Sequence, residues 1–130
     1  MASIFTRIIQ REIPAHIVAE DDNYLAFLDI MPLMRGHTLV VPKMEVDYIF
    51  DLDDSALSGL AVFAKRVSFA IRKATSCKRI AVVVLGLEVP HAHIHLVPMN
   101  TMSDANFSNP KLKLTSEELA AITMKIRDSF

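Results

Sequence analysis

The most informative part of the sequence is His91-Ala92-His93-Ile94-His95-Leu96-Val97-Pro98, which holds three of the five histidines of the chain at every second position. The apolar residues between them are typical of a β-strand, whose successive side chains point to opposite faces. We therefore predict a strand that turns Ala92, Ile94 and Leu96 into a core. Its other face would carry three imidazole rings about 7 Å apart, a row suited to lining a functional site.

The segments around this strand predict an α+β domain built on an antiparallel sheet. We expect helices over residues 3–12, about 55–74 and from 115 to the end, and strands over 16–20, 24–29, 37–41 and 80–85. The apolar run Ile80 to Leu85 predicts a strand buried on both faces, hence central in the sheet and paired with the histidine strand. A length of 130 residues predicts one domain, 1–130.

Composition excludes several classes of partner. A net charge of −1 is no signature of a nucleic-acid-binding protein. A lone cysteine, Cys77, excludes an internal disulfide and suits a reducing compartment. No apolar run is fit for a signal peptide or long enough to cross a membrane, so we expect a cytoplasmic protein that binds neither nucleic acid nor membrane.

The helix expected over residues 55–74 is apolar on more than one side. One face carries an apolar stripe: Leu57, Leu60, Ala61, Ala64, Val67 and Ile71. Further apolar residues lie off that stripe: Val62, Phe63, Phe69 and Ala70. A helix covered only by its own sheet does not need this second set, so we expect a homodimer.

Three aligned imidazoles suit phosphoryl chemistry. Histidine acts as nucleophile, base or ligand near pH 7. In the favoured interpretation, His93 attacks phosphorus and His95 binds a phosphate oxygen or assists the leaving group. His91 and His37 hold the neighbouring rings in the reactive tautomer, and no metal is required.

Two other interpretations stay open on the residues alone. A His-x-His strand also presents ligands to zinc, with His37 or Cys77 as further donors. In the least favoured interpretation, the three rings are surface residues of an edge strand. Three histidines in register beside an apolar strand favour the phosphoryl interpretation over both.

Residues 3–98 carry a resemblance to a known family. The run His91 to Val97 is similar to the His-φ-His-φ-His-φ-φ signature (φ apolar) of the histidine triad (HIT) family. Five earlier segments resemble its nucleotide-binding (Hint) branch in order and spacing: Ser3-Ile4-Phe5-Thr6-Arg7-Ile8-Ile9, Glu12-Ile13-Pro14, Ala19-Glu20-Asp21-Asp22, Leu25-Ala26-Phe27-Leu28-Asp29-Ile30 and Gly36-His37-Thr38-Leu39-Val40-Val41-Pro42-Lys43.

The resemblance implies a HIT-like fold and a reaction. Each chain would form a five-stranded antiparallel sheet with a long helix and shorter terminal helices, joined across a two-fold axis into a ten-stranded dimer. The activity would be hydrolysis or transfer at the α-phosphate of a purine nucleoside monophosphate ester, anhydride or phosphoramidate, with no cofactor. Carried over by position, His93 is the nucleophile that forms a nucleotidyl-imidazole, His95 contacts the phosphate, and His91 and His37 orient the rings.

The resemblance also implies a nucleotide pocket. Asp29 matches the acid that accepts hydrogen bonds from ribose hydroxyls. Five apolar residues match the walls around the base: Ile4, Phe5, Ile8, Phe27 and Ile30. Ordinary core packing is the alternative for each of the five taken alone.

The chain departs from the family pattern beside the triad. Gly86-Leu87-Glu88 stands where the family commonly has Gly-Gln and a small hydroxyl residue, and Ile80 replaces a phosphate-contacting asparagine. We keep Gly86 and Glu88 in the predicted nucleotide-binding set, although Glu88 puts a carboxylate near a phosphate. A nucleotide-binding regulator with little turnover is therefore the alternative function. Ser3 and Thr6 replace the cysteines that bind structural zinc in some bacterial members, so no such metal is expected.

Overall fold

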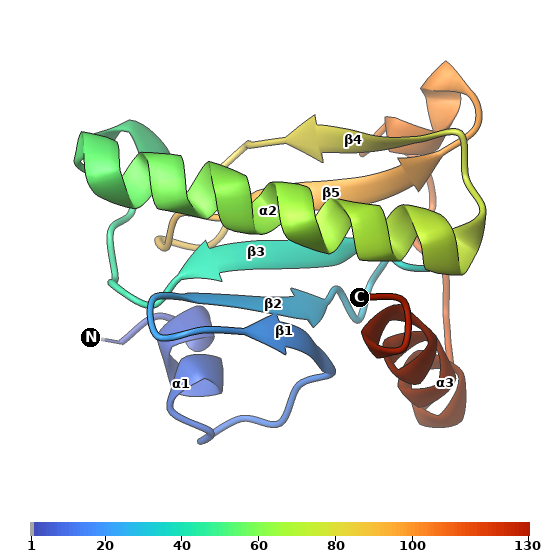
Figure 1. Cartoon of the computed structure of the whole chain (residues 1–130), viewed down its shortest axis with the longest axis horizontal. Helices are drawn as coiled ribbons and strands as arrows, with labels where there is room; N and C mark the ends of the chain where they lie inside the picture. The colour runs from blue at the N-terminus through green and yellow to red at the C-terminus, as the bar shows by residue number, and fades with distance from the viewer. Residues whose placement is uncertain (1) are drawn as a thin grey trace.

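Short stretches of local sequence set where the elements begin and end. A computed structural model describes residues 2–130 of the protein (Figure 1). In chain order the elements are α1 (Ile4–Ile9), β1 (Ile17–Glu20), β2 (Tyr24–Leu28), β3 (Thr38–Pro42), the 3₁₀ helix η1 (Ile49–Asp51), α2 (Asp54–Thr75), β4 (Arg79–Val83), β5 (Ile94–Met99), the 3₁₀ helix η2 (Met102–Ala105) and α3 (Ser116–Arg127). Every element predicted from the sequence is present.

The five strands form one antiparallel sheet in the order β1-β2-β3-β5-β4. In the centre, Leu39 of β3 lies opposite His95 of β5. The predicted fold class, a five-stranded antiparallel sheet with a long helix and shorter terminal helices, is confirmed for the single chain.

The predicted central position of the strand over residues 80–85 is wrong. β4 pairs with β5 as expected, but its other side is the free edge of the sheet. Val82 is 66% exposed, and the residues that follow the strand, Val84 and Leu85, are exposed as well. The apolar run therefore marks an uncovered edge in the single chain.

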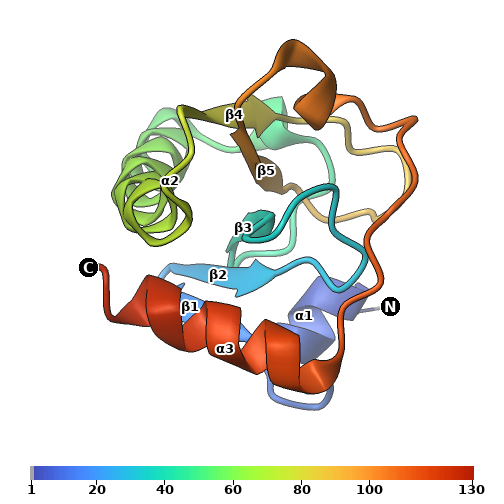
Figure 2. The same ribbon diagram turned by 90° about the vertical axis from the view of Figure 1, so that its right-hand side faces the viewer.

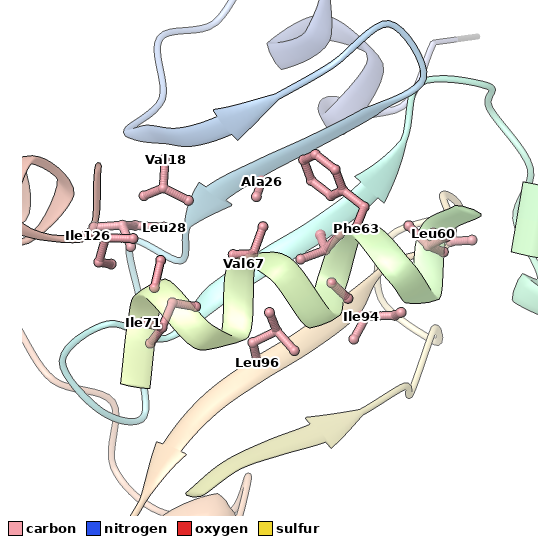
Figure 3. Packing of buried hydrophobic residues seen from close by; sticks show 14 of the residues in the cluster. Val18, Ala26, Leu28, Leu60, Phe63, Val67, Ile71, Ile94, Leu96 and Ile126 are labelled. Carbon is pink, nitrogen blue, oxygen red and sulfur yellow. The ribbon is translucent and has the colours of Figure 1, made fainter. Parts of the chain in front are cut away.

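The larger core lies between α2 and one face of the sheet, as Figure 3 shows for Val67 and Ile71 over Leu28 and Leu96. Asp53 caps α2 by accepting a hydrogen bond from the Ala56 N–H. The buried side of α2 consists of Leu60, Phe63, Ala64, Val67, Ala70, Ile71 and Ala74.

This buried side differs in part from the predicted stripe. Phe63 and Ala70 belong to it, whereas Ala61 is exposed. Val62 and Phe69 remain uncovered, at 56% and 63% exposure. The predicted second apolar face is thus narrower than expected but present.

The opposite face of the sheet is covered by α1. Ser3 caps this helix by accepting a hydrogen bond from the Thr6 N–H. Phe5 and Ile8 then pack on Phe27 and neighbouring sheet residues in a second, smaller core. The helix is shorter than the predicted 3–12 and is followed by Arg11 in the left-handed conformation, with φ of 64°.

The histidine strand also begins later than predicted. The Ala92 N–H donates to the Val46 C=O instead of to a ladder partner, and β5 starts at Ile94. The alternation of faces nevertheless extends back through the preceding residues. Ala92 and Ile94 lie in the core under α2, as predicted.

The face away from α2 is where loops converge. Figure 2 shows α2 on one side of the sheet and, on the other, the segment that leads from β5 to α3. This segment crosses the loop between β2 and β3, where the Leu112 N–H donates to the Pro32 C=O. Within residues 2–130 no helix is long and apolar enough to span a bilayer.

Candidate functional site

Four of the five histidines gather on the sheet face opposite α2. His37 precedes β3, His91 and His93 precede β5, and His95 lies in β5. All four side chains are buried to at least 91%. Ring centroids lie 5.0 Å apart for His93 and His95 and 5.2 Å apart for His95 and His37. The sequence-predicted histidines therefore form one cluster.

The tautomer of His37 follows from its backbone partner. Gly36, with φ of 92°, adopts a left-handed conformation that favours glycine and leads the chain into β3. The Leu33 N–H then donates to His37 Nδ1 over 3.0 Å. A neutral ring that accepts at Nδ1 carries its proton on Nε2.

His95 accepts a hydrogen bond from this N–H of His37. His37 Nε2 lies 3.0 Å from His95 Nδ1, so Nε2–H donates and Nδ1 accepts. The proton of His95 is thereby assigned to Nε2. Burial, reinforced by neighbouring positive charge, lowers the pKa of His37 to about 3 and that of His95 to about 4. Both rings are neutral at pH 7.

His93 has the opposite tautomer. Its Nδ1 lies 2.7 Å from the His91 C=O, which can only accept, so the neutral ring has its proton on Nδ1 and its lone pair on Nε2. Within residues 2–130 no fully buried side-chain nitrogen or oxygen lacks a partner. Nε2 of His93 and Nε2 of His95 have no such partner, so both atoms reach the surface. One is a free nucleophilic lone pair, and the other is a free N–H donor.

His91 anchors the segment that carries His93. Its Nε2–H donates to the Pro42 C=O over 2.8 Å, and its Nδ1 lies 2.8 Å from Ser3 Oγ. Glu45 ties the start of α1 to this place by accepting from the Ser3 N–H and the Thr6 hydroxyl, each over 2.6 Å. These hydrogen bonds hold the pKa of Glu45 at about 2. No contact of Ser3 or Thr6 with the histidines was predicted from the sequence, and Glu45 was not singled out.

Asp29 lies at the margin of the cluster. Its Oδ1 accepts from the Met31 N–H over 2.8 Å, and its Oδ2 is 3.7 Å from His37 Nε2. Burial raises the pKa of this carboxyl, although the charge of Lys111 works in the other direction. The side chain is 21% exposed and so remains accessible to a ligand.

The predicted walls of the base pocket divide into two groups. Phe5, Ile8 and Phe27 are buried in the smaller core, where Phe5 also meets the His93 ring edge-on at 5.0 Å. Ile4 and Ile30 are 49% and 64% exposed. Core packing alone thus accounts for Ile8 and Phe27, while Phe5 contacts the cluster directly.

The residues predicted just before the triad are less enclosed. Gly86 has φ of 81° and, with His93, borders an open hollow of about 620 Å³ whose other walls include Tyr48 and Phe50. Glu88 is exposed, and its charge acts on Asp29. Leu87 is 96% exposed, and its side chain has no group that can donate a hydrogen bond to the site.

Two residues of the site were missed in the sequence. Phe107 packs edge-on against His95, with centroids 4.8 Å apart, and Lys111 lies over the Phe107 ring. A signal was available, because Phe107 is the single aromatic residue between Phe69 and Phe130 and stands in a polar loop.

The donor atoms do not suit a metal ion in this arrangement. Asp29, His37 and His95 bring one potential ligand atom each within 4.8 Å of the others. His37 cannot use Nε2 as a ligand while the Leu33 N–H occupies Nδ1, because a neutral imidazole has one free lone pair. Cys77 lies beyond α2, next to Lys78, whose N–H bonds Asn100 past the far end of β5.

Comparisons with known proteins agree with this geometry. Residues 10–102 match the model of the HIT domain family. An uncharacterized HIT-like protein of Borreliella burgdorferi is 34% identical over 95% of this chain and 94% of its own length. The adenosine 5'-monophosphoramidase HNT1 of Saccharomyces cerevisiae is 36% identical over 75% of this chain and 62% of its own. The crystal structure of a zinc-bound histidine triad family protein from Mycobacterium smegmatis superposes with a TM-score of 0.81 at 26% identity, covering 99% of this chain and 93% of that one.

Proposed function

The chain belongs to the HIT domain family, and from this membership and the state of its histidines we propose that it is a metal-independent nucleotide hydrolase or transferase. The substrate is a purine nucleoside monophosphate conjugate, namely a phosphoramidate, ester or anhydride. The similarity to a monophosphoramidase makes an adenosine phosphoramidate the first compound to test.

The observation that carries the proposal is the lone pair on His93 Nε2. Because the His91 C=O holds Nδ1–H, a neutral His93 ring carries its lone pair on Nε2, and that atom is open to a ligand. An imidazole in this state can attack phosphorus without first losing a proton. His95 supports it from the adjacent position, where its Nε2–H is available to a phosphate oxygen.

We propose a reaction in two steps. His93 Nε2 forms a bond to the α-phosphorus, and the P–N bond of a phosphoramidate breaks with its electron pair going to the departing amine, which takes a proton from water. Water then attacks the nucleotidyl-His93, releasing the nucleoside monophosphate and restoring the free imidazole. His95 stabilises the negative charge on phosphorus oxygens in both steps.

The nucleotide would lie between α1 and the loop after β2. Asp29 is the proposed acceptor for the ribose hydroxyls, and its partly exposed carboxylate has one oxygen outside the Met31 hydrogen bond. Phe5 reaches both His93 and Phe27. Ile4 and Ile30, exposed on either side, are the proposed flexible walls around the base.

Turnover of an adenosine phosphoramidate tests this function. We expect the wild-type protein to release adenosine monophosphate in the presence of a chelator, and His93→Ala to lose at least about 10³-fold in kcat, since the nucleophile is gone. His16→Ala is the matched control, because His16 is the one histidine outside the cluster. Release that stops on adding the chelator would contradict the mechanism and favour the metal-dependent alternative.

A nucleotide-binding regulator is the second candidate. It is favoured by the segment before the triad, where exposed Leu87 and Glu88 leave the cluster without an extra amide donor. Loss of one transition-state donor costs about 10²- to 10³-fold in rate. Tight binding of adenosine monophosphate with no turnover in either wild type or His93→Ala would establish this candidate instead.

We also propose that two copies associate through the edge of β4 and the uncovered side of α2. The exposed apolar residues Val82 and Phe69 support this pairing. Continuation of one sheet across a two-fold axis would join the two edges. The unpaired thiol Cys77 suits a reducing compartment, and the cytoplasm is the proposed location.

A further inference from the structure

The segment 106–113, here called the strap, is fastened across the histidine cluster. Its turn is closed by the Asn109 side-chain amide, which donates to the Ser103 C=O over 2.6 Å. Its other end is held where the Leu112 N–H donates to the Pro32 C=O over 2.8 Å. The strap therefore has a defined position beside the loop that carries Asp29 (Figure 2).

Phe107 at the turn closes one side of the cluster. Its ring meets His95 at 4.8 Å between centroids with an interplanar angle of 74°, and His37 at 6.0 Å and 90°. These edge-on contacts fix the aromatic ring beside the two neutral imidazoles. The residues that follow Phe107 in the strap are therefore held close to the cluster.

Lys111 is partly buried beside Phe107. Its ammonium donates to the Phe107 C=O over 2.8 Å and lies 5.4 Å from the centroid of the Phe107 ring. Among residues 2–130 no carboxylate lies within salt-bridge distance of it. An ammonium has three donors, so two remain for a ligand.

The charge of Lys111 acts on several ionisable groups of the cluster. Its positive charge lowers the pKa of Asp29, of His37 and of His95, and no other lysine or arginine among residues 2–130 acts on all three groups. Because His37 and His95 are neutral at pH 7, they offer hydrogen bonds but no positive charge. A phosphate arriving at His93 thus meets Lys111 as the available counter-charge on this side.

We propose that Lys111 binds a phosphate oxygen of the nucleotide and that the strap is the element that delivers it. This inference rests on the proposed function and adds a binding residue from a segment outside the triad. The shared chemistry is an anionic phosphate held by an ammonium beside the His95 N–H. The nucleoside part of the ligand does not enter the contact.

Calorimetric titrations with adenosine monophosphate and with adenosine separate charge recognition from structural support. We expect Lys111→Met to weaken adenosine monophosphate binding about 10- to 100-fold, the range of a charge-assisted hydrogen bond, and to leave adenosine binding unchanged. Lys111→Arg should restore most of the affinity. Lys113→Met is the control, since exposed Lys113 has the same charge two residues further along the strap.

The outcomes separate this inference from the function on which it rests. Equal weakening for adenosine and its monophosphate in Lys111→Met would mean that Lys111 only supports the strap, and an equal loss in Lys113→Met would mean unspecific electrostatics. Either result overturns the assignment of Lys111 and leaves the proposed function standing. A wild-type protein that binds neither compound overturns both.

Discussion

At the scale of single residues, the site depends on backbone groups that can act only as a hydrogen-bond donor or only as an acceptor. The Leu33 N–H must donate and the His91 C=O must accept, so His37 and His93 hold their protons on different nitrogens. The resulting hydrogen bond from His37 to His95 leaves His95 as a donor toward the site. None of these partners has a recognisable sequence signal, because each is brought close only by the fold.

Neutral, buried His95 predicts a loss of stability in mild acid. Burial lowers its pKa from 6.5 to about 4, so between these values the unfolded chain binds a proton that the folded chain does not, and stability falls as pH falls. One such proton is worth about 1.4 kcal/mol per pH unit. From pH 6 to pH 5 we expect the free energy of unfolding to fall by about 1 kcal/mol more in wild type than in His95→Gln, whose amide oxygen can still accept from His37.

Urea unfolding at the two pH values measures this difference. Equal losses of free energy of unfolding in wild type and His95→Gln would show that folded His95 is already charged at pH 5. The hydrogen bond from His37 to His95 would then be absent at pH 5, because a charged His95 turns a second N–H toward the Nε2–H of His37.

At the scale of elements, local patterns were sufficient wherever one face of a segment is buried. The cap residues Ser3, Asp53 and Thr115 start three helices, and each is of a type that favours this position, Thr115 with Glu118 as a capping box. The predicted start of the histidine strand was wrong because the Ala92 N–H finds the distant Val46 C=O. The strap is a polar loop by composition, so its position over the cluster was not predictable from periodicity.

The contact between α2 and β2 gives a prediction at this scale. Gly59 in α2 faces the Tyr24 ring, and an added Cβ would overlap its hydroxyl end. Tyr24 cannot simply swing away, because its hydroxyl donates to the Ala56 C=O over 2.9 Å and its ring packs 5.7 Å from that of Phe63. We expect Gly59→Ala to lower the free energy of unfolding by about 1–3 kcal/mol, the cost of overpacking, as measured by urea unfolding.

A double-mutant comparison isolates this contact. In a Tyr24→Ala background, the same Gly59→Ala change should raise stability by up to about 1 kcal/mol, because alanine is the better helix former. Destabilisation of equal size in both backgrounds would place the cause elsewhere than in the Tyr24 ring.

At the scale of the whole molecule, the uncovered surface is more informative than the core. The apolar run over 80–85 predicted a strand inside the sheet, whereas β4 lies at its edge. Phe69 of α2 and Ile80 of β4 border the same shallow hollow, whose rim also carries Arg72, Lys78 and Arg79, so the uncovered side of α2 lies beside β4. An apolar edge strand left bare is prone to pair with another chain. The proposed second copy of the chain would cover both the extra apolar residues of α2 and the bare edge of β4.

This proposed pairing predicts the solution mass and how to change it. Light scattering at micromolar concentration should give about 29 kDa for wild type, twice the 14.5 kDa of one chain. Lysines in place of Phe69 and Val82, which are 63% and 66% exposed, would force unpaired charges into the shared surface, and we expect about 14.5 kDa for the double variant. Met124→Lys, on α3 and 55% exposed, should remain at the higher mass. A wild type that already scatters as a single chain would mean that the β4 edge is protected in some other way, and the proposed pairing would have to be abandoned.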